Sequence, residues 1–283
     1  MRAASSLLLM RRRGPADAIV PPMTDMPESE TTDWRQVFEG TYSTAASPTE
    51  ERIWREVFGE EYPEGLDPYS FVSRTELARF ADEVHVGPGA VLVDIGCGRG
   101  GAGLWVAAAT DADLIGIDIA DAALVAARQR AAAMGRTNAT FRRGEFEATG
   151  LEDESADAVM SIDALLFTPS KAAAFVELRR ILRPGGRLVL TSWDYHTQPV
   201  GRPPQVPDHR PLAEAAGLRV LAYDTTDDWR ERGARVGRGL LDAVEELAAE
   251  DGKPVDEVRA GIVEMNATLQ TMSRRFFLVA EAR

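Results

Sequence analysis

The polar and apolar positions over residues 90–193 alternate between two periods. Short apolar runs, typical of buried strands, are separated by stretches with helical spacing. The expected strands are 90–95, 113–119, 139–146, 157–163 and 185–193, and the expected helices between them are 100–110, 122–134 and 170–182. This alternation predicts a parallel sheet covered by helices on both faces, with ligands beyond the carboxyl ends of the strands.

Helical patterns flank this region on both sides. Before it, the pattern predicts helices over 33–40, 49–58 and 73–84. After it we expect a polar loop, a helix, a strand, a long helical stretch and a last strand, over 194–209, 211–216, 218–224, 229–272 and 274–282. The expected organisation is an N-terminal helical cap at 31–85 and a main domain at 86–283 with a helical lid insertion at about 227–272.

Residues 1–30 carry neither pattern and are expected to form a disordered tail. Their apolar stretch, Leu7–Met10, is too short for a secretory signal and is followed by the cluster Arg11–Arg13. No window of the chain approaches the roughly 18 apolar residues of a transmembrane helix. We therefore expect a cytoplasmic protein with no membrane partner, and either Met23 or Met26 could be its true start.

The stretch VLVDIGCGRGGAG after the first expected strand has two interpretations. Gly96, Gly98 and Gly101 fit the G-x-G-x-x-G pattern of dinucleotide-binding proteins. Asp94 with Gly96, Gly98 and Gly100 fits D-x-G-x-G-x-G, a glycine loop associated with S-adenosylmethionine (SAM). Both ligands would place a negative group, a pyrophosphate or a carboxylate, beside the backbone N–H groups of the loop and the helix start. The loop alone does not decide between them.

Residues further along the chain favour SAM. An acid at Asp118 suits the ribose hydroxyls of either ligand. Glu145 could accept from an adenine amino group, and Pro184 with Gly185 predicts a type II turn before the fifth strand. Acids at or just past the expected strand ends indicate the rim of a site; they are Asp94, Asp118, Glu145, Asp163 and Asp194.

The runs VLVDIGCGRGGAGLWVA, LIGIDIADAALVAARQRA, FRRGEFEATGLEDESADAVMSIDALLF and LRRILRPGGRLVLTSW, in this order, resemble the class I SAM-dependent methyltransferases. The resemblance covers about residues 70–225. The prefix YPEGLDPYSFVSRTEL and the helices rich in Ala and Arg are similar to those of small-molecule methyltransferases of high-GC bacteria. It implies an α/β fold with a Rossmann-like, doubly wound sheet of seven strands, mostly parallel with an antiparallel last strand. It also implies SAM as cofactor and S-adenosylhomocysteine (SAH) as product.

The resemblance further implies a role for particular residues. Those expected to hold the methionine part of SAM are Asp94, Gly96, Cys97, Gly98 and Gly100. Asp118 is expected to bind the ribose, and those expected at the adenine are Ile119, Glu145 and Phe146. The family more often has Asp where this chain has Glu145. Those expected near the sulfonium are Ser161, Asp163 and Ala164.

Candidates for a general base are few, because the chain has three histidines. His196, just beyond the fifth expected strand, is best placed to reach a substrate, and Tyr195 is beside it. His209 closes the same loop, and His85 is expected to be structural. A general base would speed methylation of a hydroxyl or carbon acid by about 10²–10⁴-fold.

Composition limits the partners and cofactors that we expect for this chain. The 283 residues carry a formal net charge of −13, which would repel a phosphate backbone, so no nucleic acid is expected. The single cysteine, Cys97, excludes an intrachain disulfide and suits a small space-filling role in the glycine loop. The chain has no Cys or His spacing typical of a metal site, so no metal is expected. A monomer or a homodimer is expected.

The leading hypothesis is methyl transfer from SAM to a small secondary-metabolite acceptor, enclosed by the aromatic N-terminal helices and the helical lid. One alternative is a protein with a SAM fold that acts as a non-methylating cyclase or binding scaffold. A third is an NAD-dependent oxidoreductase, although a Tyr-x-x-x-Lys pair or comparable hydride-transfer pair is absent.

Overall fold

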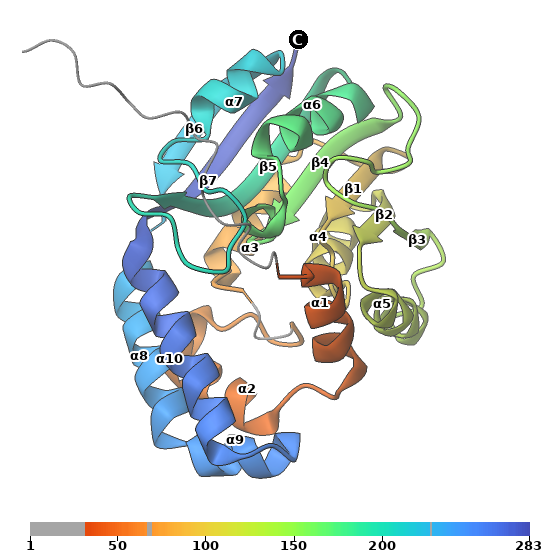
Figure 1. Cartoon of the computed structure of the whole chain (residues 1–283). Helices are drawn as coiled ribbons and strands as arrows, with labels where there is room; N and C mark the ends of the chain where they lie inside the picture. The colour runs from red at the N-terminus through yellow and green to blue at the C-terminus, as the bar shows by residue number, and fades with distance from the viewer. Residues whose placement is uncertain (1–31, 67–69, 227) are drawn as a thin grey trace, which may run out of the picture. The chain divides into compact units, whose positions relative to one another are not determined.

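The computed structural model describes residues 32–66, 70–226 and 228–283, so the predicted tail lies outside the described residues. In the described part of the chain the strands are β1 (Val91–Ile95), β2 (Asp113–Asp118), β3 (Ala139–Arg143), β4 (Ala156–Ile162), β5 (Leu182–Tyr195), β6 (Leu218–Thr225) and β7 (Met272–Ala282). They form one sheet in the order β3-β2-β1-β4-β5-β7-β6 (Figure 1).

Strand directions agree with the predicted fold. β7 runs antiparallel to its neighbours β5 and β6, and the remaining neighbours pair in parallel. The predicted seven-stranded, mostly parallel sheet with an antiparallel last strand is therefore confirmed. The order of strands along the chain reverses between β1 and β4, and ligands of open α/β sheets bind beyond the carboxyl ends at such a point.

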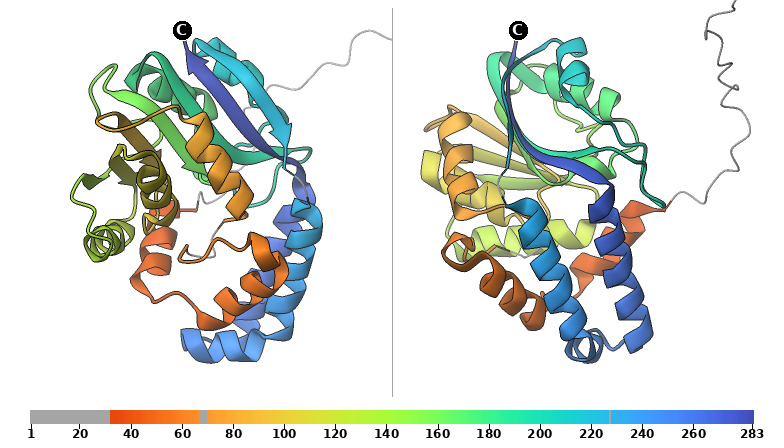
Figure 2. Two further views of the ribbon diagram at one scale, coloured as in Figure 1. Left: turned by 180° about the vertical axis from the view of Figure 1, so that it is seen from behind. Right: turned by 90° about the vertical axis from the view of Figure 1, so that its left-hand side faces the viewer.

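Helices cover both faces of the sheet (Figure 2). They are α1 (Trp34–Ser43), α2 (Pro48–Phe58), α3 (Arg74–Glu83), α4 (Gly101–Thr110), α5 (Asp121–Ala133), α6 (Lys171–Ile181), α7 (Arg210–Ala215), α8 (Trp229–Asp242), α9 (Val244–Asp251) and α10 (Val255–Thr271), with short 3-10 helices η1 (Gly59–Glu61) and η2 (Leu165–Phe167). On one face α3, α4 and α5 bury Phe80, Leu104 and Leu124. On the other, α6 and α7 bury Phe175 and Ala213. Within the described ranges, no helix has the length and apolar character needed to cross a membrane.

The helical stretch between β6 and β7 forms three helices that pack with α2, away from the sheet (Figure 1). The helical conformation is interrupted between α9 and α10. Gly252, with a φ of +65°, follows the end of α9, and Pro254 precedes α10. The apolar side chains shared by α2 and this insertion include Ile53, Trp54, Phe58, Leu240 and Leu247. The N-terminal cap and the insertion therefore build a hydrophobic cluster of their own.

Two strands differ in length from the prediction. β3 ends at Arg143, and Glu145 lies beyond it in a single antiparallel bridge with Ala148. β5 runs from Leu182 to Tyr195, longer than the predicted 185–193, because β4 pairs with it at Leu182 and β7 pairs with it up to Tyr195. Gly185 has the positive φ that the predicted turn requires, +78°, but Pro184 and Gly185 lie inside β5 and not before it.

Candidate functional site

A cavity of about 750 Å³ lies at the carboxyl ends of β1, β2 and β4. Its volume is within the range of about 300–1,000 Å³ that is usual for small-molecule sites. The predicted cofactor residues that line it are Asp94, Gly96, Cys97, Gly98, Asp118, Ile119, Glu145, Phe146, Asp163 and Ala164. The sequence motifs therefore converge on one cavity, formed by segments that are far apart in the chain.

Asp118, at the end of β2, holds the glycine loop. Its Oδ2 atom accepts from the backbone N–H of Gly98 at 2.8 Å, and its Oδ1 accepts from that of Ala120 at 3.0 Å. Gly98 has a φ of +51°, and a Cβ atom there would lie 2.9 Å from the hydroxyl oxygen of Tyr42. Only glycine fits this position without strain, and the backbone of the loop stays close to the Asp118 carboxylate.

Asp94 lines the same end of the cavity and is 3% exposed. Burial, and after it the charge of Asp118, raises the pKa of Asp94 to about 7. A hydrogen bond from the backbone N–H of Gly103 acts in the opposite direction. Burial also raises the pKa of Asp118. The charges of Asp94 and Asp118 interact, and both acids are buried. The pair therefore favours a ligand that brings a cation or hydrogen-bond donors, since either would stabilise the charged forms of the two acids.

Two predicted cofactor residues, Gly100 and Ser161, are not among the described residues that line the cavity. Gly100 precedes α4 with a φ of +76°, and a Cβ atom there would lie 3.0 Å from that of Ala127. The fully buried Ser161 hydroxyl donates to the carbonyl of Ile95 at 2.8 Å. Both residues therefore support the cavity wall from behind, and their predicted contacts with the cofactor gain no support from this geometry.

Cys97 lines the cavity but has the properties of a packing residue. Its side chain is buried, and a Cβ atom at Gly116 would lie 3.1 Å from its sulfur. Burial raises the pKa of the thiol well above its ordinary value. Because the thiolate is the reactive form of cysteine, this environment is unsuited to a nucleophile.

Helix α1 supplies a wall of aromatic side chains. Trp34, Phe38 and Tyr42 recur every four residues and line the cavity, whereas Val37 on another side of the helix is 42% exposed. The ring centroids of Trp34 and Phe38 each lie 4.8 Å from that of Phe167. The helical spacing of Trp34, Phe38 and Tyr42 is the sequence signal from which this aromatic wall could be predicted. Among the described residues, none from α8, α9 or α10 lines the cavity, so the predicted lid insertion does not enclose it here.

Neither candidate base lies at the cavity. Of the residues described, those lining it include neither His196 nor Tyr195. The His196 side chain is exposed, and its backbone N–H donates to the carbonyl of Thr271 at 3.0 Å. Tyr195 is 3% exposed, and burial raises the pKa of its hydroxyl. The extension of β5 along β7 carries both residues away from the site, so the geometry gives their predicted role no support.

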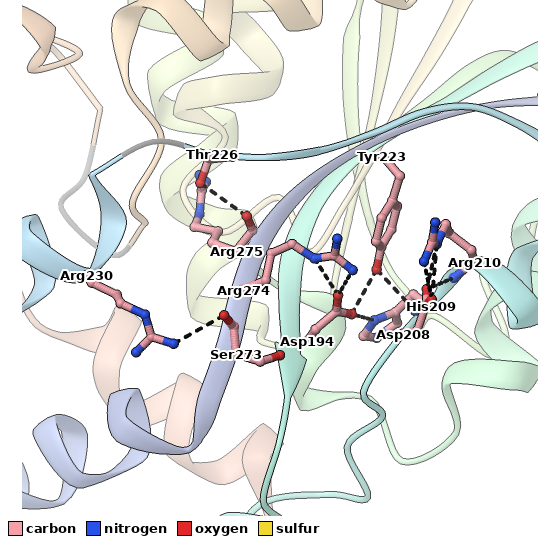
Figure 3. Close-up of polar contacts among 10 residues, drawn as sticks. All are labelled: Asp194, Asp208, His209, Arg210, Tyr223, Thr226, Arg230, Ser273, Arg274 and Arg275. Atoms are coloured by element: carbon pink, nitrogen blue, oxygen red, sulfur yellow. Dashed lines mark hydrogen bonds and ion pairs between the residues drawn. The ribbon is translucent and has the colours of Figure 1, made fainter.

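Asp194 does not form part of the cavity rim, contrary to the prediction. Its Oδ1 accepts from the Tyr223 hydroxyl at 2.8 Å and lies 2.9 Å from Nδ1 of His209 (Figure 3). Its Oδ2 accepts from Nε of Arg274 at 2.8 Å. Burial lowers the pKa of His209, so the ring is neutral and donates its Nδ1–H to Asp194. These four residues, called the Asp194 cluster below, bond to one another away from the cavity.

Comparisons with known proteins identify the family. Residues 87–217 match the family described as methyltransferase domain. Methyltransferase GfsG of Streptomyces halstedii is 27% identical over 129 residues, 45% of this chain and 46% of the relative. The chloroplastic tocopherol O-methyltransferase of Arabidopsis thaliana is 27% identical over 197 residues, 62% and 57% of the two chains. The chain thus spans about half the length of these curated relatives.

The fold is also that of solved structures. The [4+2]-cyclase SpnF superposes with a TM-score of 0.68 at 19% identity, covering 89% of this chain and 96% of that one. The family match spans the glycine loop, Asp118, Glu145 and Asp163, and it resolves the choice between dinucleotide and SAM that the loop left open. By its motifs, its sheet and this match, residues 87–217 form a methyltransferase domain of the class I SAM-dependent type.

Proposed function

We propose that the protein transfers a methyl group from SAM to a small acceptor with a large apolar body, of the secondary-metabolite type. The observation that carries this proposal is the continuity of the cavity. One space of about 750 Å³ reaches from the glycine loop and Asp118 to the aromatic wall of α1 and Phe167. A polar end suits the cofactor, and an aromatic end suits an apolar acceptor.

The residues present fit SAM. The glycine loop and the first turn of α4 offer backbone N–H groups for its carboxylate, and Asp94 offers charge for its ammonium group. Asp118 would accept from the ribose hydroxyls. The side chains proposed to border the adenine are Ile119, Glu145 and Phe146, and those proposed beside the sulfonium are Asp163 and Ala164. When bound, SAM supplies a methyl group activated by its sulfonium.

The protein's part in such a reaction is to align and to exclude water. Methyl transfer from a sulfonium is an in-line displacement, and a correctly held nucleophile gains most of its advantage from position. Trp34, Phe38 and Phe167 pack against one another at the apolar end of the cavity. We propose that this wall holds the acceptor and keeps the site dry. We expect a cytoplasmic monomer or homodimer.

Calorimetry and product analysis test the proposal. We expect SAM and SAH to bind the full chain and NADH not to bind. We expect SAH to form when SAM is incubated with a panel of apolar acceptors that carry a hydroxyl, amine or activated carbon. Binding of NADH alone would contradict the proposal. Binding of SAM with conversion of an acceptor but no SAH formed would favour the cyclase alternative.

A further inference from the structure

Arg275 of β7 is a fully buried arginine, 1% exposed, that connects the cavity wall to the N-terminal cap. Its Nε donates to Oδ1 of Asp163, and its Nη2 donates to Oδ2, each at 3.0 Å. Its Nη1 donates to Oε1 of Glu76 at 2.6 Å and to Oγ1 of Thr226 at 3.2 Å. Of these residues, Asp163 lines the cavity. We call Asp163, Glu76 and Arg275 the Arg275 cluster.

The orientation of Asp163 is fixed from several directions. Its Oδ2 also accepts from the Ser70 hydroxyl at 3.2 Å and from the backbone N–H of Phe71 at 3.0 Å. Its φ of +51° is uncommon for a residue other than glycine. Glu76 is fixed as well, because its Oε2 accepts from the N–H of Ser73 in a capping box. Contacts within the protein therefore fix the orientation of both carboxylates.

Arg275 places a full positive charge directly behind the Asp163 carboxylate. Burial alone would lower the pKa of Arg275, but the charges and hydrogen bonds of Asp163 and Glu76 raise it above its ordinary value. Asp163 precedes Ala164, whose Cβ lies 2.4 Å from the position of a Cβ on Gly96. The ion pair thus lies at the wall that abuts the glycine loop, where we propose the sulfur of the cofactor to be.

The charge on that sulfur is the chemical difference between the two ligands. SAM has a cationic sulfonium, and SAH has a neutral thioether. A bare carboxylate beside the sulfur would bind SAM more tightly than the transition state, in which the charge is dispersing, and would slow the transfer. A carboxylate neutralised from behind avoids this ground-state stabilisation.

We propose that Arg275 is a positioning residue that orients Asp163 and offsets its charge, and that this pair sets how strongly the protein distinguishes SAM from SAH. The inference rests on the proposed function, because it requires both ligands to bind in this cavity. It assigns a role in ligand selection to a residue that does not itself line the cavity.

Calorimetry of the full chain with SAM and with SAH tests this role without a known acceptor. Asp163→Asn keeps the size of the side chain and makes the charge of the Arg275 cluster more positive by one unit, because Arg275 stays paired with Glu76. We expect it to weaken SAM about tenfold more than SAH, the order produced by a unit charge several ångströms away in a partly buried site. The double variant Asp163→Asn/Arg275→Met restores the wild-type net charge of the cluster, and the affinity ratio is expected to return to within about threefold of the wild type.

The matched control is Arg274→Met, which removes the neighbouring arginine on the other face of β7 and should leave the ratio unchanged. Equal weakening of both ligands in Asp163→Asn, or no recovery in a folded double variant, would show a purely structural role and overturn the proposal. If the double variant does not fold, Glu76→Gln replaces it, and a ratio unchanged from the wild type overturns the proposal as well. Failure of the wild type to bind either ligand would instead refute the proposed function.

Discussion

Two consecutive arginines of β7 form ion pairs with aspartates on opposite faces of the sheet. Arg275 pairs with Asp163 at the cavity wall, and Arg274 pairs with Asp194 in the buried Asp194 cluster (Figure 3). Successive residues of a strand point to opposite faces, so one short segment serves both regions. The first pair faces a space for ligands, and the second is closed off by His209 and Tyr223.

The difference between the two regions lies in where each strand ends. β4 ends at Ile162, and Asp163 then leaves the sheet with a positive φ and reaches the cavity. β5 continues to Tyr195, so Asp194 stays inside a ladder of hydrogen bonds with β7. Of these two acids, the one that lies beyond the end of its strand reaches the cavity, and the one that is paired with β7 does not. Side chains of the first region should determine binding, and those of the second should determine stability.

The largest expected effect is on stability, in Asp194→Ala. The substitution leaves the buried His209 without its acceptor and removes the ion-pair partner of Arg274, whose side chain is 27% exposed. The Tyr223 hydroxyl loses the same acceptor. Each buried polar group left without a partner costs about 1–3 kcal/mol. We expect a large fall in the free energy of unfolding in urea, with SAM affinity of the folded fraction unchanged. The control is Asp208→Ala, which breaks a solvent-exposed pair with Arg210 and should change stability little. Similar losses of unfolding free energy in Asp194→Ala and Asp208→Ala would show that the Asp194 cluster has no special role in stability.

The next largest effect is on binding, in Asp118→Ala. This substitution removes the proposed ribose contacts and the hydrogen bond to the Gly98 N–H. Hydrogen bonds to a charged group contribute about 1.5–3 kcal/mol each, so SAM affinity should fall by about 100-fold. Calorimetry with SAM measures the loss, and thermal unfolding checks the fold. Asp113→Ala, in the exposed first residue of the same strand, should leave affinity unchanged. Unaltered affinity in Asp118→Ala would refute the assignment of the ribose site.

Local sequence signals predicted the cofactor side of the site well. Asp94, Gly98 and Asp118 all line the cavity, because a short strand, a tight glycine turn and a helix start are determined by neighbouring residues. Sheet topology was predictable for a similar reason, since alternating strands and helices admit few arrangements. The aromatic spacing of α1 was also visible, although only the tertiary structure shows that it faces the cavity.

The predictions that the structure does not support concern residues whose positions depend on contacts between segments distant in sequence. The placement of Asp194 and His196 depends on the pairing of Tyr195 with Met272, which no local pattern reveals. The sequence also gives no indication that Arg275 is buried, because an arginine before an apolar strand is typical of an exposed strand start. Its burial follows from the presence of Asp163, distant in sequence, on the facing wall. Long-range charge pairing of this kind requires the structure.

The two regions should also respond oppositely to pH. The folded-state pKa of Asp94 is about 7, above the ordinary value of about 3.9, so Asp94 adds stability at low pH that is lost as pH rises through 7. Relative to the ligand-free wild type, Asp94→Asn should gain roughly 1–3 kcal/mol of stability between pH 5 and pH 8. Urea unfolding at several pH values measures this difference.

His209 provides the opposite sign within the same measurement. Its folded-state pKa is lowered, so its contribution to stability is present above the unfolded value of about 6.5 and is lost as pH falls below it. His209→Gln should therefore be least destabilising at pH 5 and most destabilising at pH 8. Parallel curves for Asp94→Asn and His209→Gln would show that the cavity and the Asp194 cluster do not differ in this way.

The smallest effect, and the finest test of the comparison, concerns α1. This helix has no fully buried residue, and it is held by Phe38 against Phe167 and by the carboxylate of Glu39, which accepts from the N–H of Ala122 at 3.2 Å. Phe38→Ala removes an aromatic pair worth about 1 kcal/mol and should weaken SAH binding about fivefold. Val37→Ala, one residue away on an exposed face, should not change it.

Stopped-flow fluorescence of Trp34, whose ring centroid lies 5.9 Å from that of Phe38, can follow the dissociation of SAH. If α1 covers the bound ligand, the loss of affinity in Phe38→Ala should appear as faster dissociation, with the melting temperature nearly unchanged. A fall in melting temperature without a change in dissociation rate would place Phe38 with the side chains that stabilise the fold. The boundary between the binding region and the stability region would then have to be drawn inside the cavity wall.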